Sequence, residues 1–221
     1  MSNVVGPRTA DSWTAADLVN RFGAIPLSRV RHDPAPGTAT HEDVVQLHAR
    51  EGRLYELVDQ TLVEKTVGTY ESYLALMLGR LLGNFVSERN LGIVLGADGM
   101  LRLTPYLVRI PDVSFISWKR LPNRRIPDQA IADLVPDLAV EIISPGNTQE
   151  EMDRKLREYF AAGVQQVWYV DPRRREINVY GAVDHSKTIS QRQTIEGGDI
   201  LPGFTLSVAE FFAGPAAPDK A

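Results

Sequence analysis

The chain has 221 residues and a mass of 24.5 kDa, carries a formal charge of −4 and contains no cysteine. Its hydrophobic share of 43% and charged share of 24% are ordinary for a globular protein, which excludes disordered and fibrous classes. The lack of cysteine excludes disulfide scaffolds, thiolate zinc sites, iron–sulfur clusters and cysteine nucleophiles. The acidic balance argues against a protein that coats nucleic acid through a global basic field.

The first thirty residues contain no continuous apolar run of the kind found in a signal peptide. No stretch approaches the ~18 apolar residues of a membrane span. We therefore expect a soluble protein without membrane contact. The absence of cysteine fits a reducing compartment, and we expect the protein to be cytoplasmic.

Residues 1–50 are interpreted as an N-terminal arm with short helices. One helix is predicted from Thr14, and a second opens with the capping sequence Thr40-His41-Glu42-Asp43. Prolines and a glycine between residues 26 and 37 separate the two. The main domain is predicted to span 51–213, followed by a frayed Pro/Ala-rich tail at 214–221.

The main domain begins with a predicted hairpin, strands 53–58 and 62–67 joined at Asp59-Gln60, followed by a long amphipathic helix over 69–90. Thr148 and Glu151 form the pattern of a capping box, so a helix is expected from there to Gly163. The remaining predicted strands or strand-like segments are 93–95, 100–103, 107–110, 113–116, 138–143, 167–170 and 177–180, and a final segment around 206–212 completes the domain. This order predicts an α/β domain with helices on a central sheet.

Two acidic residues stand at unusual places in this pattern. Asp112 follows Pro111 between two predicted strands, and Glu141 interrupts the apolar run 138–143, which is typical of a strand covered on both faces. A buried carboxylate is costly unless it is neutralised, paired or bound to a metal. Glu141 is thus either a structural acid, paired with an arginine or capping a helix, or a ligand of a divalent metal shared with Asp112.

Lys155 borders the apolar stripe of the helix that follows Glu141, because it lies three residues after Met152 and four before Tyr159. An inward lysine needs a partner, and Glu141 is the plausible one. The alternative is a lysine whose ammonium reaches past the stripe to water.

Taken together, these pieces resemble the bacterial "putative restriction endonuclease" family of the PD-(D/E)xK nuclease superfamily. The resemblance covers about 130 residues between 53 and 180, and its strength lies in the order of the pieces. They are Tyr55-Glu56-Leu57-Val58-Asp59, Ile110-Pro111-Asp112-Val113, Pro136 to Pro145, Lys155-Leu156-Arg157-Glu158-Tyr159, Ala162-Gly163-Val164 and Val167 to Pro172.

The resemblance implies a restriction-endonuclease-like core, a twisted mixed β-sheet flanked by helices, and a Mg²⁺-dependent endonuclease acting on DNA, with Mn²⁺ as a substitute. It implies that Asp112, Glu141 and the backbone carbonyl of Ile142 hold the metal. The sequence departs from the superfamily pattern where a lysine is usual, because Ile143 stands there. Lys155 on the following helix is the relocated candidate, and Asp112, Glu141 and Lys155 form the predicted catalytic set. By analogy, a homodimer is expected because two strands must be cut.

Two further acids are possible members of this site. Glu71 lies on the long helix and faces either the metal or solvent, and Glu56 alternates between Tyr55 and Leu57 and faces either the cleft or water. Asp98 is interpreted as a turn residue. The weaker candidates for phosphate contact are the basic residues of one loop, Lys119, Arg120, Arg124 and Arg125; a second cluster, Arg173 to Arg175, fits a solvated turn equally well.

Three functions remain open at this point. The first is a metal-dependent DNA endonuclease. The second is a catalytically weak or inactive module of the same fold that binds nucleic acid or a protein partner, favoured by Ile143 and the acidic charge. The third is a metal-dependent phosphoesterase acting on small nucleotides.

Overall fold

The computed structural model describes residues 13–66 and 68–214, and all its strands belong to a six-stranded, a four-stranded and a two-stranded sheet. The helices are α1 (Ala15–Phe22), α2 (His41–Glu51), α3 (Thr69–Glu88), α4 (Gln149–Ala162) and α5 (Val208–Ala213), with short 3-10 turns at Leu27–Arg29 and Pro122–Arg124. The strands are β1 (Tyr55–Val58), β2 (Thr61–Glu64), β3 (Gly92–Leu95), β4 (Leu101–Thr104), β5 (Leu107–Arg109), β6 (Val113–Ser117), β7 (Leu138–Ile142), β8 (Gln166–Asp171), β9 (Glu176–Ala182), β10 (His185–Ile189), β11 (Thr194–Glu196) and β12 (Thr205–Ser207).

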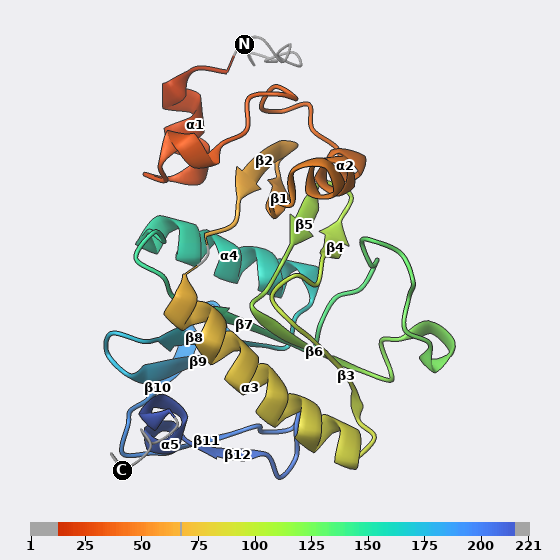
Figure 1. Cartoon of the computed structure of the whole chain (residues 1–221). Helices are drawn as coiled ribbons and strands as arrows, with labels where there is room; N and C mark the ends of the chain where they lie inside the picture. The colour runs from red at the N-terminus through yellow and green to blue at the C-terminus, as the bar shows by residue number, and fades with distance from the viewer. Residues whose placement is uncertain (1–12, 67, 215–221) are drawn as a thin grey trace, which may run out of the picture.

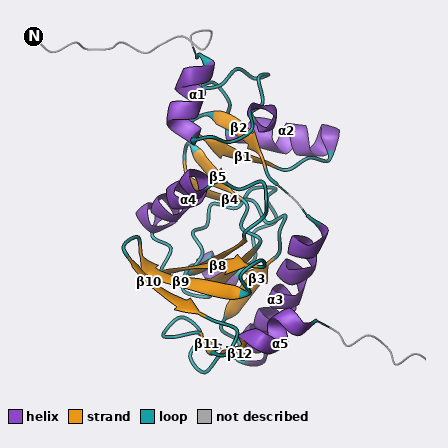
Figure 2. Cartoon of the chain, turned by 90° about the vertical axis from the view of Figure 1, so that its left-hand side faces the viewer, coloured by secondary structure: helices purple, strands orange, loops and turns teal. Residues whose placement is uncertain are grey.

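The six-stranded sheet is mixed, with the order β10-β9-β8-β7-β6-β3. Its central pair, β7 and β8, is parallel, and every other pair in it is antiparallel. α3 runs along one face of this sheet, and α4 lies between it and the four-stranded sheet in both views (Figures 1 and 2). The predicted class, a twisted mixed sheet flanked by helices, is confirmed.

The four-stranded sheet, with the order β2-β1-β5-β4, lies at the end of the molecule that carries α1 and α2 (Figure 1). Its predicted hairpin forms, and Asp59 and Gln60 take the positive φ values, 47° and 55°, of a tight two-residue turn. The N-terminal arm packs onto this sheet, since Phe22 of α1 shares a core with Val58 and Val63. The division into an arm, a domain and a tail stays a prediction, and residues 215–221 of that tail lie outside the described residues.

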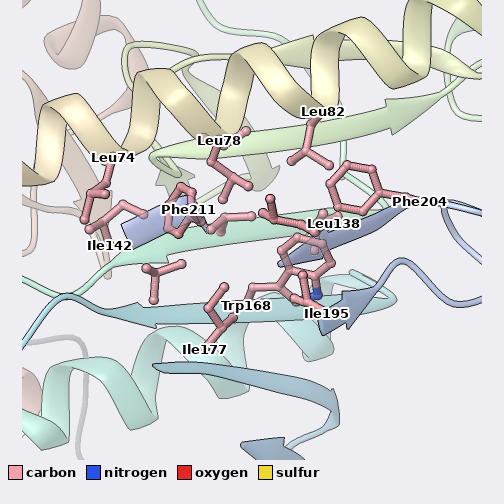
Figure 3. Packing of buried hydrophobic residues seen from close by; sticks show 14 of the residues in the cluster. Leu74, Leu78, Leu82, Leu138, Ile142, Trp168, Ile177, Ile195, Phe204 and Phe211 are labelled. Atoms are coloured by element: carbon pink, nitrogen blue, oxygen red, sulfur yellow. The ribbon is translucent and has the colours of Figure 1, made fainter. Parts of the chain in front are cut away.

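The face of the six-stranded sheet under α3 is an apolar core. Leu74, Leu78 and Leu82 descend from α3 onto Leu138, Trp168 and their neighbours, and all five are fully buried (Figure 3). The spacing of four residues places the three leucines on one side of the helix.

No helix of the described residues is long and apolar enough to cross a bilayer.

The cap of α4 and the strand β10 differ from the sequence predictions. Thr148 caps α4 by accepting a hydrogen bond from the Glu151 N–H, but the Glu151 carboxylate does not return to the cap, because it pairs with Arg29 and Asn147 instead. The hairpin strand β10 was not predicted, since four of its five residues are exposed and it carries no apolar alternation.

Candidate active site

Glu141 leaves β7 toward α4, and the alternation of the strand explains why. Leu138, Val140 and Ile142 pack in the core under α3, whereas Ala139 packs in the core on the α4 side. Because successive side chains of a strand point to opposite faces, Glu141 shares the face of Ala139. The strand that was expected to be covered on both faces is buried at all five positions.

The carboxylate of Glu141 is bound by two side chains of α4. The Lys155 ammonium lies 3.2 Å from its Oε2, and the Tyr159 hydroxyl donates a hydrogen bond to its Oε1. The same ammonium lies 3.4 Å from Oε1 of Glu56 on β1. The four side chains are buried, so the Lys155 ammonium compensates the charge of two carboxylates away from water. The predicted partnership of Lys155 with Glu141 is present in the structure.

Glu56 is in turn held by a second cation. The Arg109 guanidinium lies 2.6 Å from its Oε2, and the Ile110 N–H donates to its Oε1 over 3.2 Å. Arg109 also binds Glu158, whose other oxygen accepts a 2.8 Å hydrogen bond from Arg154. Arg154 also donates to the carbonyl of Arg21 in α1, so the charge network runs from Glu141 to α1.

The network shifts the pKa values of Glu56 and Glu141 in opposite directions. Burial raises the pKa of Glu56, but Arg109 and Lys155 outweigh it and lower that pKa to about 2. Burial raises the pKa of Glu141, and the nearby charges of Asp112 and Glu56 raise it further against the opposing effect of Lys155. The pKa of Lys155 is itself raised: burial lowers it, but Glu141 and Glu56 outweigh that effect.

Asp112 stands beside Glu141 at the end of the sheet. The pair Val113–Val140 is in register between β6 and β7, so the residues one step further, Asp112 and Glu141, meet at the same point. The Ile142 N–H donates a 2.7 Å hydrogen bond to Asp112 Oδ2, while Oδ1 lies 2.9 Å from the ammonium of Lys65. Each acid is therefore bound to its own lysine.

A cavity of about 210 Å³ opens next to Asp112. Its wall includes Lys65, Asp112, Ile142 and Glu71, together with Asp98. Glu141 and Lys155 are not part of this wall. Only one of the two acids is thus reached directly from the cavity.

Comparison with known proteins relates this arrangement to a nuclease family. The model of the family described as "Uma2: Putative restriction endonuclease" matches residues 41–209, more than half of the chain. The chain belongs to this family. No curated protein matches it.

The chain is also similar to a solved structure, "a putative nuclease belonging to DUF820 from Anabaena variabilis ATCC 29413". The sequence identity is 18%, the match covers 72% of this chain and 90% of that one, and the TM-score is 0.64. At this identity the likeness concerns the fold alone. The family predicted from the sequence is confirmed.

Glu71, a possible additional site residue, belongs to the wall of the cavity from the first turn of α3. Its carboxylate lies over the backbone of Gly68, where an added Cβ would come within 2.0 Å of Oε2. Any side chain at Gly68 would displace Glu71. Glu56, the other possible member, is sealed inside the charge network and contacts neither the cavity nor water.

The basic loop predicted to contact nucleic acid lies at the far end of β6. Asp112 precedes this strand and Lys119 follows it, and five residues of strand span about 16 Å. Arg120 is used internally, because its guanidinium donates to Asp137 and to the Gly163 carbonyl. Arg124, exposed like Lys119 and Arg125, stacks over the Trp118 ring. The loop thus lies about one strand's length from Asp112, and its contact with nucleic acid stays a prediction.

The second basic cluster, Arg173 to Arg175, lies at the same end of the sheet as Glu141. Arg173 and Arg174 follow β8, which is parallel to β7, so they leave the sheet at the end where Glu141 and Ile142 lie. Both arginines line a further cavity of about 320 Å³. Ser144 borders this cavity and the one beside Asp112, so the two are adjacent.

Sequence reasoning missed three members of the site: Lys65, Arg109 and Tyr159. Arg109 interrupts the apolar stretch 107–110, which is the signal that identified Glu141, and it could have identified Arg109 too; Lys65 lies between Glu64 and Thr66 and carries no such signal. Tyr159 was assigned to the apolar stripe of α4, and nothing in the sequence indicates that its hydroxyl binds Glu141.

Proposed function

We propose that the protein is a metal-dependent endonuclease that hydrolyses phosphodiester bonds of DNA, with Mg²⁺ as the cofactor and Mn²⁺ as a substitute. The observation that carries the proposal is the meeting of Asp112 and Glu141 at one end of the central sheet, beside a cavity. Asp112, Glu141 and the backbone carbonyl of Ile142 would hold the ion.

The donors present suit this ion. Mg²⁺ prefers oxygen ligands, keeps several waters and is often bound by only one or two carboxylates. In the described residues no group of three or more histidine or acidic side chains is arranged for a metal, so a zinc-type site is not supported there. When bound, the ion would supply an activated water and neutralise charge on the phosphate.

The protein's own residues prepare the two carboxylates. Lys155 and Tyr159 fix both oxygens of Glu141, and the Ile142 N–H fixes one oxygen of Asp112. Groups held in this way need little reorganisation when charge develops during the reaction. Lys155 acts here on the carboxylates rather than on the cavity, so we assign it a positioning role.

One observation favours the second candidate, an inactive module that binds nucleic acid or a protein. Both acids already have a lysine partner, and the site is electrostatically satisfied without a metal. A scaffold that had lost activity could persist in this form. Metal binding distinguishes the two candidates, because a scaffold has no reason to retain it.

The test is cleavage of plasmid and single-stranded DNA by the purified chain with Mg²⁺ or Mn²⁺. We expect Asp112→Ala and Glu141→Ala to abolish cleavage while the circular dichroism spectrum stays that of the wild type. The matched control is Asp184→Asn, an exposed acid in the turn between β9 and β10, which should cut like the wild type. Absence of both metal binding and cleavage in the wild type would contradict the proposal and favour the module.

A further inference from the structure

Two lysines, Lys65 and Lys155, lie at this site, and only Lys65 borders the cavity. The side chains of Lys65 and Lys155 are 5% and 4% exposed, so exposure does not separate them. The cavity does, because Lys65 belongs to its wall with Asp112 and Lys155 does not. A substrate phosphate that enters the cavity would meet Lys65.

The contacts of Lys65 are those of a cation in a cage of oxygens. Its ammonium lies 2.9 Å from Asp112 Oδ1, 2.6 Å from the Ile110 carbonyl and 3.0 Å from the Ala97 carbonyl. The three protons of the Lys65 ammonium thus have three acceptors, and one of these, Asp112, is a proposed metal ligand. A positive charge at this place neutralises Asp112 when no metal is bound, and it opposes a divalent ion on the same carboxylate.

The contacts of Lys155 are of another kind. Both acceptors of its ammonium are buried carboxylates, Glu141 and Glu56, and Glu56 is tied to Arg109. Moving Lys155 toward a substrate would leave those charges unpaired inside the protein, which is strongly unfavourable. Lys65 pairs with one carboxylate only, at the rim of a cavity.

We infer that Lys65, on the segment after β2, is the lysine that contacts the substrate phosphate. Its ammonium stays paired with the Asp112 carboxylate until a divalent cation binds to that carboxylate. The inference rests on the proposed function and deepens it. It assigns a catalytic role to a residue outside the predicted set, and it leaves Lys155 as the residue that positions Glu141.

The absence of cysteine from the chain allows a selective test. Lys65→Cys and Lys155→Cys each introduce a single thiol, and alkylation with 2-bromoethylamine converts it to an aminoethyl thioether that restores an ammonium at the same place. Mn²⁺ affinity is measured by titration calorimetry, DNA cleavage by single-turnover kinetics, and folding by thermal melting, before and after alkylation.

For Lys65→Cys we expect Mn²⁺ to bind at least tenfold more tightly, because the competing charge is gone, while cleavage falls at least a hundredfold. Alkylation should reverse both changes. For Lys155→Cys we expect a lower melting temperature and weaker Mn²⁺ binding, because Glu141 and Glu56 lose their shared partner. Mn²⁺ affinity is thus expected to rise in Lys65→Cys and to fall in Lys155→Cys. A merely structural role for Lys65 would not raise the affinity.

Unchanged or weaker Mn²⁺ binding by Lys65→Cys, or cleavage equal to that of the wild type, would overturn the inference. If alkylation restores metal affinity but not cleavage, the contact with phosphate is wrong and the competition for Asp112 stands. If the wild type cuts no DNA, the proposed function fails together with the phosphate contact, and the Mn²⁺ titration still decides whether Lys65 competes for Asp112.

Discussion

The two faces of the six-stranded sheet are covered in opposite ways. Under α3 the contacts are apolar, with Leu74, Leu78 and Leu82 packed on Trp168 (Figure 3). Toward α4 the strand presents Glu141 to a buried set of charged partners. Apolar packing is non-directional and tolerates local change, whereas a buried charge depends on every partner that compensates it. The comparison teaches that one face stabilises the fold through apolar contacts, whereas the other holds buried acids whose charge depends on their partners.

The largest effect is expected from Arg109, which compensates two acids at once. Arg109→Met leaves Glu56 and Glu158 without their shared cation, so the free energy of unfolding should fall by about 3–5 kcal/mol. Urea unfolding followed by circular dichroism measures it. The matched control is Arg80→Met on the exposed side of α3, which should change stability by less than about 0.5 kcal/mol. Equal effects of the two substitutions would show that the charged face has no special dependence on its partners.

A comparable loss is expected on the apolar face, with a different consequence for the site. Leu78→Ala removes a fully buried side chain and should cost about 2–5 kcal/mol of unfolding free energy. Mn²⁺ affinity of the folded protein should stay unchanged, because Leu78 packs in the apolar core under α3. Titration calorimetry below the melting temperature checks this. A parallel loss of metal affinity would mean that the two faces are not independent.

Glu56 gives the charged face a defined dependence on pH. Its pKa is lowered from 4.5 to about 2, so the ionised group stabilises the fold above pH 4.5 and this contribution is lost as the pH falls toward 2. The full contribution is on the order of 3 kcal/mol. We expect Glu56→Gln to be less stable than the wild type at pH 7, and the difference to shrink between pH 4.5 and 3. A difference that stays constant over this range would contradict the assignment.

The smallest effect is expected at Ile143, which stands where the sequence resemblance implied a lysine. The side chain packs on the α4-side core and its N–H donates to the Val170 carbonyl. Ile143→Val should therefore cost only about 0.5–1.5 kcal/mol and leave cleavage unchanged. Thermal melting and single-turnover cleavage measure both. A sharp loss of cleavage would give position 143 a role in the reaction.

Much of the fold could be predicted because local patterns decide it. The apolar run around β7 required cover on both faces, and Gly163 ends α4 with a φ of 96°, as a helix-terminating glycine does. β10 could not be predicted, because its pairing comes from β9 in a hairpin and not from its own exposed residues.

The candidate site could likewise be predicted only in part from the sequence. Lys155 and Glu141 could be paired from the sequence because the strand leads directly into the helix. Lys65 could not be placed, because its oxygen partners come from Ala97, Ile110 and Asp112, which follow more than thirty residues later along the chain. Such a cage exists only once both sheets have formed.

The most direct test of the account is a crystal structure of the protein with Mn²⁺, read from the anomalous difference map. We predict a peak in contact with the carboxylates of Asp112 and Glu141 and the Ile142 carbonyl, with the Lys65 ammonium no longer bound to Asp112. A map with no peak at Asp112, or a peak elsewhere while Lys65 keeps its ion pair, would contradict the central claim that these residues form a metal-dependent nuclease site.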